Sequence, residues 1–339
     1  MIGSEAWLLA LGFAALAGIG TALLLLPLIV WLKTRAVLDL PNARSSHTQP
    51  TPRGGGIAVV AMVLALGLPW VTLTEQFANG LLLVGFLVLA LLFWFDDRLG
   101  GLPISLRMGA QALAVALVLG QLPPEARIAS GMLADWLPLW LERLLCFLAW
   151  LWFVNLFNFM DGINGITGVE MVGIGLGLAA CAALAGFGAA PAGLALIVAG
   201  AGLGFLRYNW GQAQVFMGDV GSVPVGFLLG GLLLQAALSG LWAAALILPL
   251  YYWFDATITL LRRALKRERI WQAHRQHFYQ QGARKAGAHA PVAGKIALLN
   301  AALIGLALLA QSGPRPWSEI AALLLGLVLV LALCRHFKE

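Results

Sequence analysis

Charged residues are scarce in this chain. Asp, Glu, Lys and Arg together make up 11% of the 339 residues, whereas 61% are hydrophobic. This balance excludes a water-soluble domain of that size, since such domains carry about 25% charged residues. Cysteine is also rare. The three cysteines fall in or beside apolar runs without paired spacing, so they indicate neither a disulfide framework nor a metal site.

What the chain has instead is long apolar runs. A helix needs roughly 20 apolar residues to cross the hydrocarbon core of a bilayer. About eleven stretches approach that length, which predicts an all-α polytopic integral membrane protein with residues 1–339 as a single domain. The first stretch lacks a basic segment before it and a small-residue cleavage site after it, so we expect a retained helix. The predicted spans are 7–31, 56–73, 80–95, 107–121, 141–157, 168–187, 190–206, 222–238, 240–258, 294–311 and 317–334.

The basic residues are unevenly distributed over the connections between these spans. Of the 21 Lys and Arg residues, 18 fall on one side if the 32–55 connection is placed inside the cell. The positive-inside rule then predicts an outer N-terminus and a cytoplasmic C-terminus. The net charge of +6 is therefore a topology signal, and with no basic soluble domain we expect no nucleic-acid partner.

Two adjacent carboxylates, Asp96 and Asp97, end the third predicted span. Such neighbours repel each other unless a cation or a hydrogen-bond network separates them. The pair therefore indicates divalent-metal or phosphate chemistry at the cytoplasmic face, where we place the active site. A simple helix stop with Arg98 as counter-ion is the alternative.

Two further motifs follow apolar runs. Asn158 and Asp161 lie three residues apart, on one face of a helix end, and Gly162 lets the backbone approach a ligand closely. Hard oxygen ligands completed by water and phosphate are what Mg²⁺ prefers. Asp219 lies in a glycine turn before a span, where backbone N–H groups can hold a phosphate. A plain turn would also explain this second motif.

The largest connection, 259–293, is a candidate for binding a polar substrate. It contains two imidazoles and a guanidinium in His274, Arg275 and His277. Zinc would need additional Cys or His ligands nearby, so binding of an anionic polar substrate fits better. A solvated loop, or a basic anchor against anionic lipid, is the alternative.

The first inner connection combines hydroxyl groups, basic residues and glycines directly before a span. Its candidates for phosphate binding are Arg44, His47 and Arg53. The segment is neither a Walker loop nor a dinucleotide fingerprint, and an ordinary linker would also have this composition.

A transporter or flippase of an anionic substrate is the alternative from another functional class. Its carboxylates are expected near the middle of the bilayer, whereas those of the three motifs map to one membrane face. Asp255, inside the ninth predicted span, keeps this alternative open, although it would also suit pairing with a basic residue. A CDP-alcohol phosphatidyltransferase is excluded because its single-helix acidic motif is absent.

Together these motifs resemble the polyprenyl-phosphate N-acetylhexosamine-1-phosphate transferases, the family of the phospho-MurNAc-pentapeptide translocase and of enzymes that initiate O-antigen, teichoic acid and dolichol-linked glycans. The resemblance covers residues from about 39 to 280 and nearly the whole span pattern. The last motif looks most like the bacterial O-antigen type, whose members use UDP-N-acetylfucosamine or related UDP sugars. The motifs stand in the family's order at 41–56, 96–97, 158–166, 216–222 and 274–277.

The resemblance implies a role for each motif. Asn158 and Asp219 would ligate Mg²⁺, with Mn²⁺ as an alternative, and Asp161 would support the same site. Asp96 and Asp97 would handle the lipid phosphate. Together with Asp161 and Asp219 they are the four candidates for catalytic residues. Uracil would be held by Gly162, Asn164 and Phe216. The sugar and pyrophosphate would face His274, Arg275 and His277.

Two departures from the family pattern concern the lipid phosphate. Arg107 stands where a lysine is usual, which keeps the charge but changes the reach. The longer acidic pattern that follows the carboxylate pair in some members is absent, because Arg98 and glycines follow here.

The implied reaction transfers N-acetylhexosamine-1-phosphate from a UDP-sugar to undecaprenyl phosphate in the bacterial inner membrane and releases UMP. It would initiate O-antigen or another cell-envelope polysaccharide. Direct attack on the β-phosphate is preferred, with an aspartyl-phosphate intermediate at Asp96 or Asp97 as the alternative. The expected partners are both substrates and the bilayer, and the resemblance hints at a homodimer.

Overall fold

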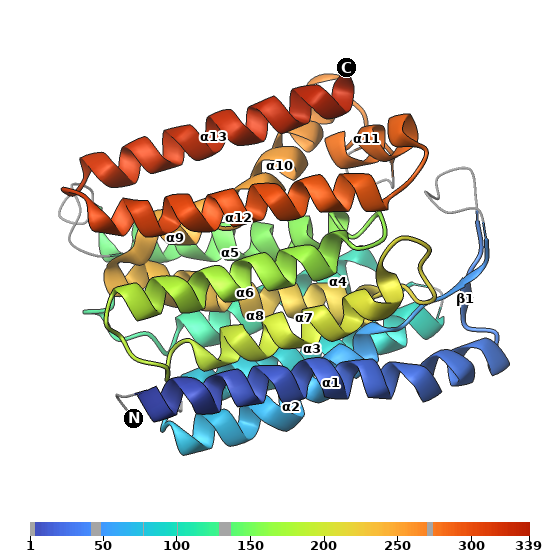
Figure 1. Cartoon of the computed structure of the whole chain (residues 1–339), viewed down its shortest axis with the longest axis horizontal. Coiled ribbons are helices and arrows are strands. Elements are labelled where there is room, and N and C mark those ends of the chain that lie inside the picture. The colour runs from blue at the N-terminus through green and yellow to red at the C-terminus, as the bar shows by residue number, and fades with distance from the viewer. Residues whose placement is uncertain (1–3, 42–48, 77, 100, 129–136, 270–273) are drawn as a thin grey trace.

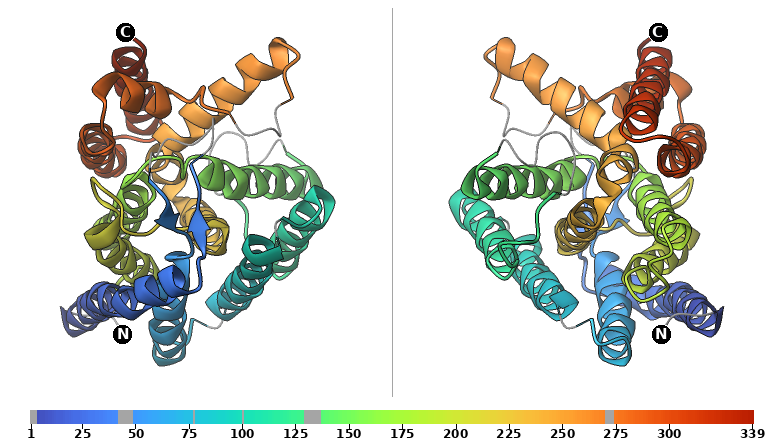
Figure 2. Two further views of the ribbon diagram at one scale, coloured as in Figure 1. Left: turned by 90° about the vertical axis from the view of Figure 1, so that its right-hand side faces the viewer. Right: turned by 90° about the vertical axis from the view of Figure 1, so that its left-hand side faces the viewer.

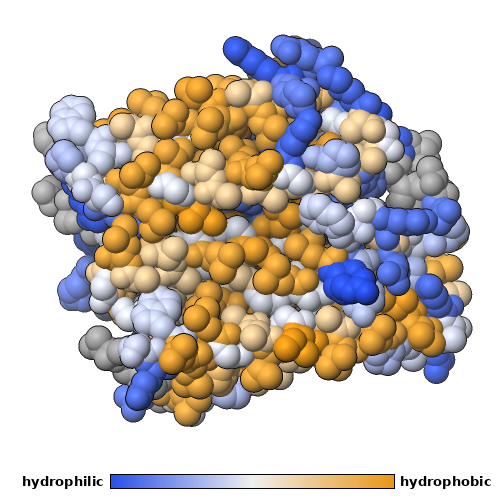
Figure 3. All heavy atoms as spheres, in the orientation of Figure 1, coloured by the Kyte–Doolittle hydropathy of each residue, from blue (hydrophilic) through white to orange (hydrophobic). Residues whose placement is uncertain are grey.

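The computed structural model describes residues 4–41, 49–76, 78–99, 101–128, 137–269 and 274–339. These residues form a bundle of helices that run roughly side by side, with the N- and C-terminal ends at opposite ends of the bundle (Figure 1). Apolar side chains cover most of the middle of the visible face, and hydrophilic residues gather towards its two ends (Figure 3). This surface is that of a protein embedded in a bilayer.

Ten of the eleven predicted spans correspond to one helix each. Among the described residues, eight segments are long and apolar enough to cross a membrane, which confirms the all-α polytopic membrane class. The number of crossings and their orientation stay predictions, since α4 and α7 are shorter apolar helices. The ten helices are α1 (Ser4–Thr34), α2 (Gly56–Leu73), α3 (Ala78–Leu99), α4 (Ile104–Leu119), α5 (Leu139–Phe159), α6 (Ile166–Leu184), α7 (Gly193–Asn209), α8 (Asp219–Ala236), α12 (Ala290–Ser312) and α13 (Trp317–Lys338).

The predicted span 240–258 is not one continuous helix. A π-helical turn η1 (Ala237–Leu241) continues α8 and contains Gly240 at φ 87°, a left-handed value that suits glycine. After α9 (Trp242–Ile247), Pro249 precedes α10 (Leu250–Leu265), and proline has no N–H with which to continue a helix. As a result α10 leaves the bundle at a slant (Figure 2).

Small residues let the helices approach closely. A Cβ atom at Gly200 of α7 would lie 2.0 Å from the carbonyl oxygen of Ala14 in α1, and one at Gly204 would lie 2.2 Å from that of Gly18. Such contacts are typical of helix packing in membranes, where close van der Waals contact replaces the hydrophobic effect. They fix α1 against α7, so the ends of both helices reach the same region.

The motif-bearing connections lie together at the end of the bundle away from the N-terminus (Figure 1). There a short antiparallel ribbon pairs β1 (Leu38–Asp39) with β2 (Thr51–Pro52). The chain after β2 joins the 216–222 motif, because the Phe216 N–H donates to the Pro52 carbonyl at 2.8 Å and the Gly55 N–H to the Phe216 carbonyl at 2.8 Å. The short helix α11 (Phe278–Ala286) lies at the same end.

Candidate active site

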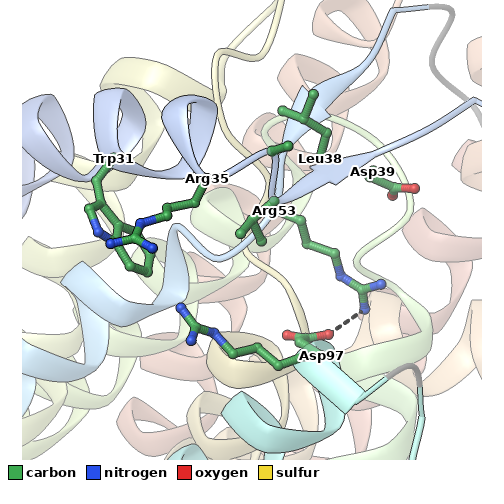
Figure 4. A pocket seen from close by; sticks show the side chains of 9 residues that line it. Trp31, Arg35, Leu38, Asp39, Arg53 and Asp97 are labelled. Carbon is green, nitrogen blue, oxygen red and sulfur yellow. Dashed lines mark ion pairs between the residues drawn. The ribbon is translucent and has the colours of Figure 1, made fainter.

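Arg53 joins two carboxylates that are far apart in the sequence. Its Nη2 atom lies 3.0 Å from Asp97 Oδ1 at the end of α3 and 2.9 Å from Asp219 Oδ1 at the start of α8. Figure 4 shows the Arg53 side chain turned towards Asp97. Burial lowers the pKa of Arg53, but the carboxylates of Asp219 and Asp97 outweigh it and raise that pKa above its usual value. Arg53 is therefore a permanent cation between two anions.

An amide and a hydroxyl group complete this arrangement. Asn158 at the end of α5 donates from Nδ2 to Asp219 Oδ1 at 3.1 Å and to Ser222 Oγ at 2.8 Å. Ser222 in turn donates to the Gly218 carbonyl at 3.2 Å. Gly218 has φ 75°, the left-handed conformation that allows the sharp turn into α8. The turn presents the Asp219 carboxylate to α5 and to the chain after β2.

Asp161 belongs to the same electrostatic region. Its Oδ1 atom accepts a hydrogen bond from the Thr167 hydroxyl. Burial raises the pKa of Asp161 to about 7; the Thr167 hydrogen bond opposes this shift, and the nearby charge of Asp219 adds to it. Asp161 is thus within electrostatic reach of Asp219 and Asp97, which belong to two other motifs.

The two adjacent aspartates point to different partners. Asp97 Oδ2 accepts from the Val220 N–H at 3.2 Å, which ties α3 to the first turn of α8. Asp96 is buried, accepts from the Leu102 N–H, and lies 3.4 Å from Arg107 Nη1. The predicted pair is therefore divided: Asp97 faces Asp219, whereas Asp96 holds the turn between α3 and α4 together with Arg107.

Two of the three predicted uracil contacts, Gly162 and Asn164, are tied to protein groups, and the backbone of the third, Phe216, bonds to the chain after β2. Asn164 donates from Nδ2 to the Gly211 carbonyl at 2.6 Å and from its backbone to His289 Nδ1 at 3.1 Å. A Cβ atom at Gly162 would lie 2.2 Å from the Tyr279 hydroxyl, so this glycine lets α11 approach. Sequence reasoning missed His289 because a single histidine before a helix has no motif.

The predicted sugar-facing histidine, His277, is 2% exposed. Its Nδ1 atom lies 3.0 Å from Asp255 Oδ1, so this ring nitrogen is engaged by the protein. The rings of His274 and Tyr279 stack on it, with centroids 4.8 and 5.5 Å away. Arg275 is adjacent in sequence and partly buried. Arg44 and His47 lie outside the described residues.

The donor set fits a hard cation. One oxygen atom each of Asp97 and Asp219 contacts the same guanidinium nitrogen, and Asn158 donates from Nδ2 to the same Asp219 oxygen. Carboxylate and amide oxygens suit Mg²⁺, which keeps several waters and substrate phosphates in its shell. No three His, Cys, Asp or Glu side chains among the described residues come close enough to hold a metal by themselves. A bound Mg²⁺ would thus depend on the substrate for further ligands.

Comparison with known proteins now decides the family. Residues 79–237 match the model of glycosyl transferase family 4. The chain is 31% identical over 281 residues to a probable undecaprenyl-phosphate N-acetylglucosaminyl 1-phosphate transferase of Bacillus subtilis, covering 77% of this chain and 74% of that protein. The chain belongs to glycosyl transferase family 4. This membership confirms the family that the sequence motifs predicted.

Two other members extend the family likeness. The chain is 32% identical over 271 residues to the phospho-N-acetylmuramoyl-pentapeptide-transferase of Thermosynechococcus vestitus, covering 73% of this chain and 67% of that protein. It is 30% identical over 251 residues to the decaprenyl-phosphate N-acetylglucosaminephosphotransferase of Mycolicibacterium smegmatis, covering 66% of this chain and 60% of that protein.

The matched family 4 segment contains most but not all of the site. It includes Asp97, Asn158, Asp161 and Asp219. Arg53 precedes the segment, and the pair formed by Asp255 and His277 follows it. The fold brings these outer residues to the same end of the bundle as the family motifs.

Proposed function

We propose that this family 4 transferase moves N-acetylhexosamine-1-phosphate from a UDP-sugar to undecaprenyl phosphate and releases UMP. The observation that carries the proposal is the meeting of Asp97, Asn158 and Asp219 around Arg53 at one end of a membrane bundle. The names of the matched relatives, which act on polyprenyl phosphates, support it. We further propose the bacterial inner membrane, a cytoplasmic site and a homodimer.

The acceptor needs little chemical activation. A phosphate monoester has a second pKa near 6, so its oxygen is largely ionised at neutral pH. In the proposed step this oxygen forms a bond to the β-phosphorus of the UDP-sugar while the bond from that phosphorus to the UMP oxygen breaks. A strong general base is not required, and positioning and charge neutralisation become the main tasks of the protein.

The residues divide these tasks. Asp219 and Asn158 would hold Mg²⁺, with Asp161 in support. When bound, this ion would neutralise phosphate charge. Arg53 keeps Asp97 and Asp219 together and offers a second cation to an incoming phosphate. Asp96 and Arg107 fix the turn next to Asp97. We therefore propose that they affect the lipid phosphate indirectly, by fixing the position of Asp97.

Donor recognition is proposed for the opposite side of the same region. Gly162, Asn164 and Phe216 would contact uracil, and His277 with Arg275 would face the sugar and pyrophosphate. Tyr279 supports this arrangement, because its hydroxyl donates to the Phe159 carbonyl at 3.1 Å and so places α11 against the 158–162 motif. An O-antigen role with UDP-N-acetylfucosamine or a related sugar is our proposal for the pathway.

The test is release of UMP by the purified chain with undecaprenyl phosphate, Mg²⁺ and a panel of UDP-N-acetyl sugars. We expect lipid-dependent release that Asp219→Asn abolishes. Glu125→Gln is the matched control, because Glu125 is an exposed carboxylate outside the described contacts of the site. No release from any donor by folded protein would refute the proposal. Exchange of labelled UMP into UDP-sugar without lipid would support the aspartyl-phosphate route.

Transport has no observation in its favour. Asp255 was the carboxylate that kept this alternative open. In the structure it accepts hydrogen bonds from the Tyr251 and Thr259 side chains and pairs with His277. Its charge is thus engaged by the protein at the same end as the other motifs.

A further inference from the structure

A cavity of about 640 Å³ opens beside Asp97, between the last turns of α1, the β ribbon and the end of α3 (Figure 4). Three guanidinium groups line it, those of Arg35, Arg53 and Arg98. Arg53 is engaged by Asp97 and Asp219. Within the part of the chain that the structure describes, Arg35 and Arg98 form no ion pair with a carboxylate. The carboxylates of Asp39 and Asp97 line the cavity as well, and both act on the charge of Arg53. Arg35 and Arg98 are therefore the two lining cations without an ion pair among the described residues.

Aromatic rings hold one of these cations in place. The guanidinium carbon of Arg98 lies 4.1 Å from the ring centroid of Trp94 and 5.3 Å from that of Trp31. The two indoles are themselves stacked, with centroids 6.2 Å apart. A cation–π contact uses the face of the guanidinium and leaves its N–H groups available for an anion. Arg35 directly follows α1, its N–H donates to the Trp31 carbonyl at 3.0 Å, and it lines the same cavity.

The apolar surroundings indicate that the anion is carried by a lipid. Leu40 follows the lining residue Asp39 in the sequence, Phe95 lies two positions before the lining residue Asp97, and the two side chains are 63% and 55% exposed. Tryptophans such as Trp31 and Trp94 are typical of the membrane interface. A lipid would place its charged head among the guanidinium groups of the cavity, beside Trp31, and leave its tail to the apolar surface of the bundle. A soluble nucleotide would leave that surface unused.

We infer that Arg98, held by Trp31 and Trp94, and Arg35 form an entry site for the phosphate of a polyprenyl phosphate acceptor; this inference rests on the proposed transferase function. The shared ligand chemistry is a lipid-borne phosphate, which bulk phospholipid also offers. A phosphate monoester carries about −1.5 to −2 charges at pH 7 and so suits two guanidinium groups better than a diester does. Asp97 lines the same cavity, so the entry site leads directly to Arg53 and Asp219.

The experiment measures lipid binding to the full-length chain in detergent by native mass spectrometry. The probes are undecaprenyl phosphate and phosphatidylglycerol, offered separately and in competition. The variants are Arg35→Gln, Arg98→Gln and the double variant. Arg207→Gln is the matched control, because Arg207 is an exposed arginine whose guanidinium carbon lies 5.5 Å from the Tyr208 ring centroid, away from the cavity.

We expect the double variant to bind undecaprenyl phosphate about tenfold more weakly or worse, as expected for loss of charge-assisted hydrogen bonds, with the control within about twofold of wild type. In the transferase assay the KM for the acceptor should rise while the KM for the UDP-sugar stays unchanged. Unchanged acceptor binding in the double variant would overturn the inference. Loss of phosphatidylglycerol binding with acceptor binding retained would also overturn it, because the site would then serve bulk lipid.

Binding needs no turnover, so this test separates the inference from the proposed function. A chain that binds the acceptor through Arg35 and Arg98 but releases no UMP would refute the transferase while keeping the lipid-phosphate site. Thermal unfolding in detergent checks that each variant is folded. If the double variant unfolds, Arg98→Lys decides the matter: it keeps the charge but loses the planar stack on Trp94, and we expect weaker acceptor binding.

Discussion

Asp255 and His277 form a buried pair that joins two helices, with Oδ1 and Nδ1 3.0 Å apart and side-chain exposures of 0% and 3%. The same carboxylate accepts the backbone N–H groups of Phe278 and Tyr279, both at 3.0 Å. Because the first N–H groups of a helix have no partner within it, Asp255 on α10 caps α11 from outside. The two helices therefore act as one unit, and the pair holds the orientation of the His277 ring through Nδ1.

Removing this cap should weaken both stability and activity. In Asp255→Ala the two α11 N–H groups and His277 Nδ1 lose their acceptor, at a cost of about 1–3 kcal/mol per buried group left unsatisfied. We expect a lower melting temperature in detergent and a lower transferase rate. Asp255→Asn keeps a side-chain acceptor and should retain more of the stability than of the activity. An Asp255→Ala protein that melts like wild type would contradict this assignment.

Gly162 should tolerate no side chain. In Gly162→Ala the new Cβ would lie 2.2 Å from the Tyr279 hydroxyl, so α11 must shift away from the 158–162 motif. We expect a raised KM for the UDP-sugar, since uracil and sugar contacts are proposed for these two segments. Gly294→Ala in α12 is the control, because a Cβ there meets nothing within 4 Å. Equal kinetics in the two variants would count against a role for this close approach.

The sequence predicted the helices well because each depends on a local property, a run of apolar residues long enough for a bilayer. The break before α10 was missed, although Gly240 and Pro249 mark it, because the surrounding residues remain apolar. The sequence also placed the carboxylates at one end of the bundle. It did not predict their pairing, since Arg53 and Asp219 are 166 residues apart and only the assembled bundle brings them together.

The division of the aspartate pair shows the same limit. Adjacent positions at a helix end point in different directions, so Asp96 meets Leu102 and Arg107 while Asp97 meets Arg53. The family resemblance implied one role, handling of the lipid phosphate, for both residues. In the structure their neighbours differ. The sequence of two adjacent residues does not show which side of α3 faces α8.

Arg53→Gln should change metal binding and activity in opposite directions. Without the guanidinium, Asp97 and Asp219 have no cation between them, so repulsion favours binding of Mg²⁺ in its place. We expect a larger Mg²⁺-induced rise in melting temperature than for wild type. Activity should nevertheless fall by about 10²-fold, because a cation aimed at the phosphates is lost.

The measurement is a thermal-shift titration with Mg²⁺ beside a UMP-release assay of the same protein. Arg207→Gln again serves as a control for loss of one positive charge at this end of the bundle. Weaker Mg²⁺ stabilisation in Arg53→Gln would show that Arg53 supports the cation site rather than competing with it.

Asp161 should make the metal-free protein sensitive to pH. Burial raises the pKa of this carboxyl to about 7 in the folded chain, compared with about 3.9 for an unperturbed Asp. A folded-state pKa above the unfolded value means that the folded state binds the proton more tightly. The stability contributed in this way is fully present below about pH 4 and is lost as the pH rises through about 7.

With a chelator present, the melting temperature of wild-type protein in detergent should therefore fall between about pH 5 and pH 8. Asp161→Asn cannot ionise and should show a flatter profile, with the difference greatest at the alkaline end. Adding Mg²⁺ should restore wild-type stability at pH 8, because a nearby cation favours the ionised carboxyl. Parallel profiles for wild type and Asp161→Asn would show that Asp161 ionises with its ordinary pKa and is not part of the electrostatic region around Asp219.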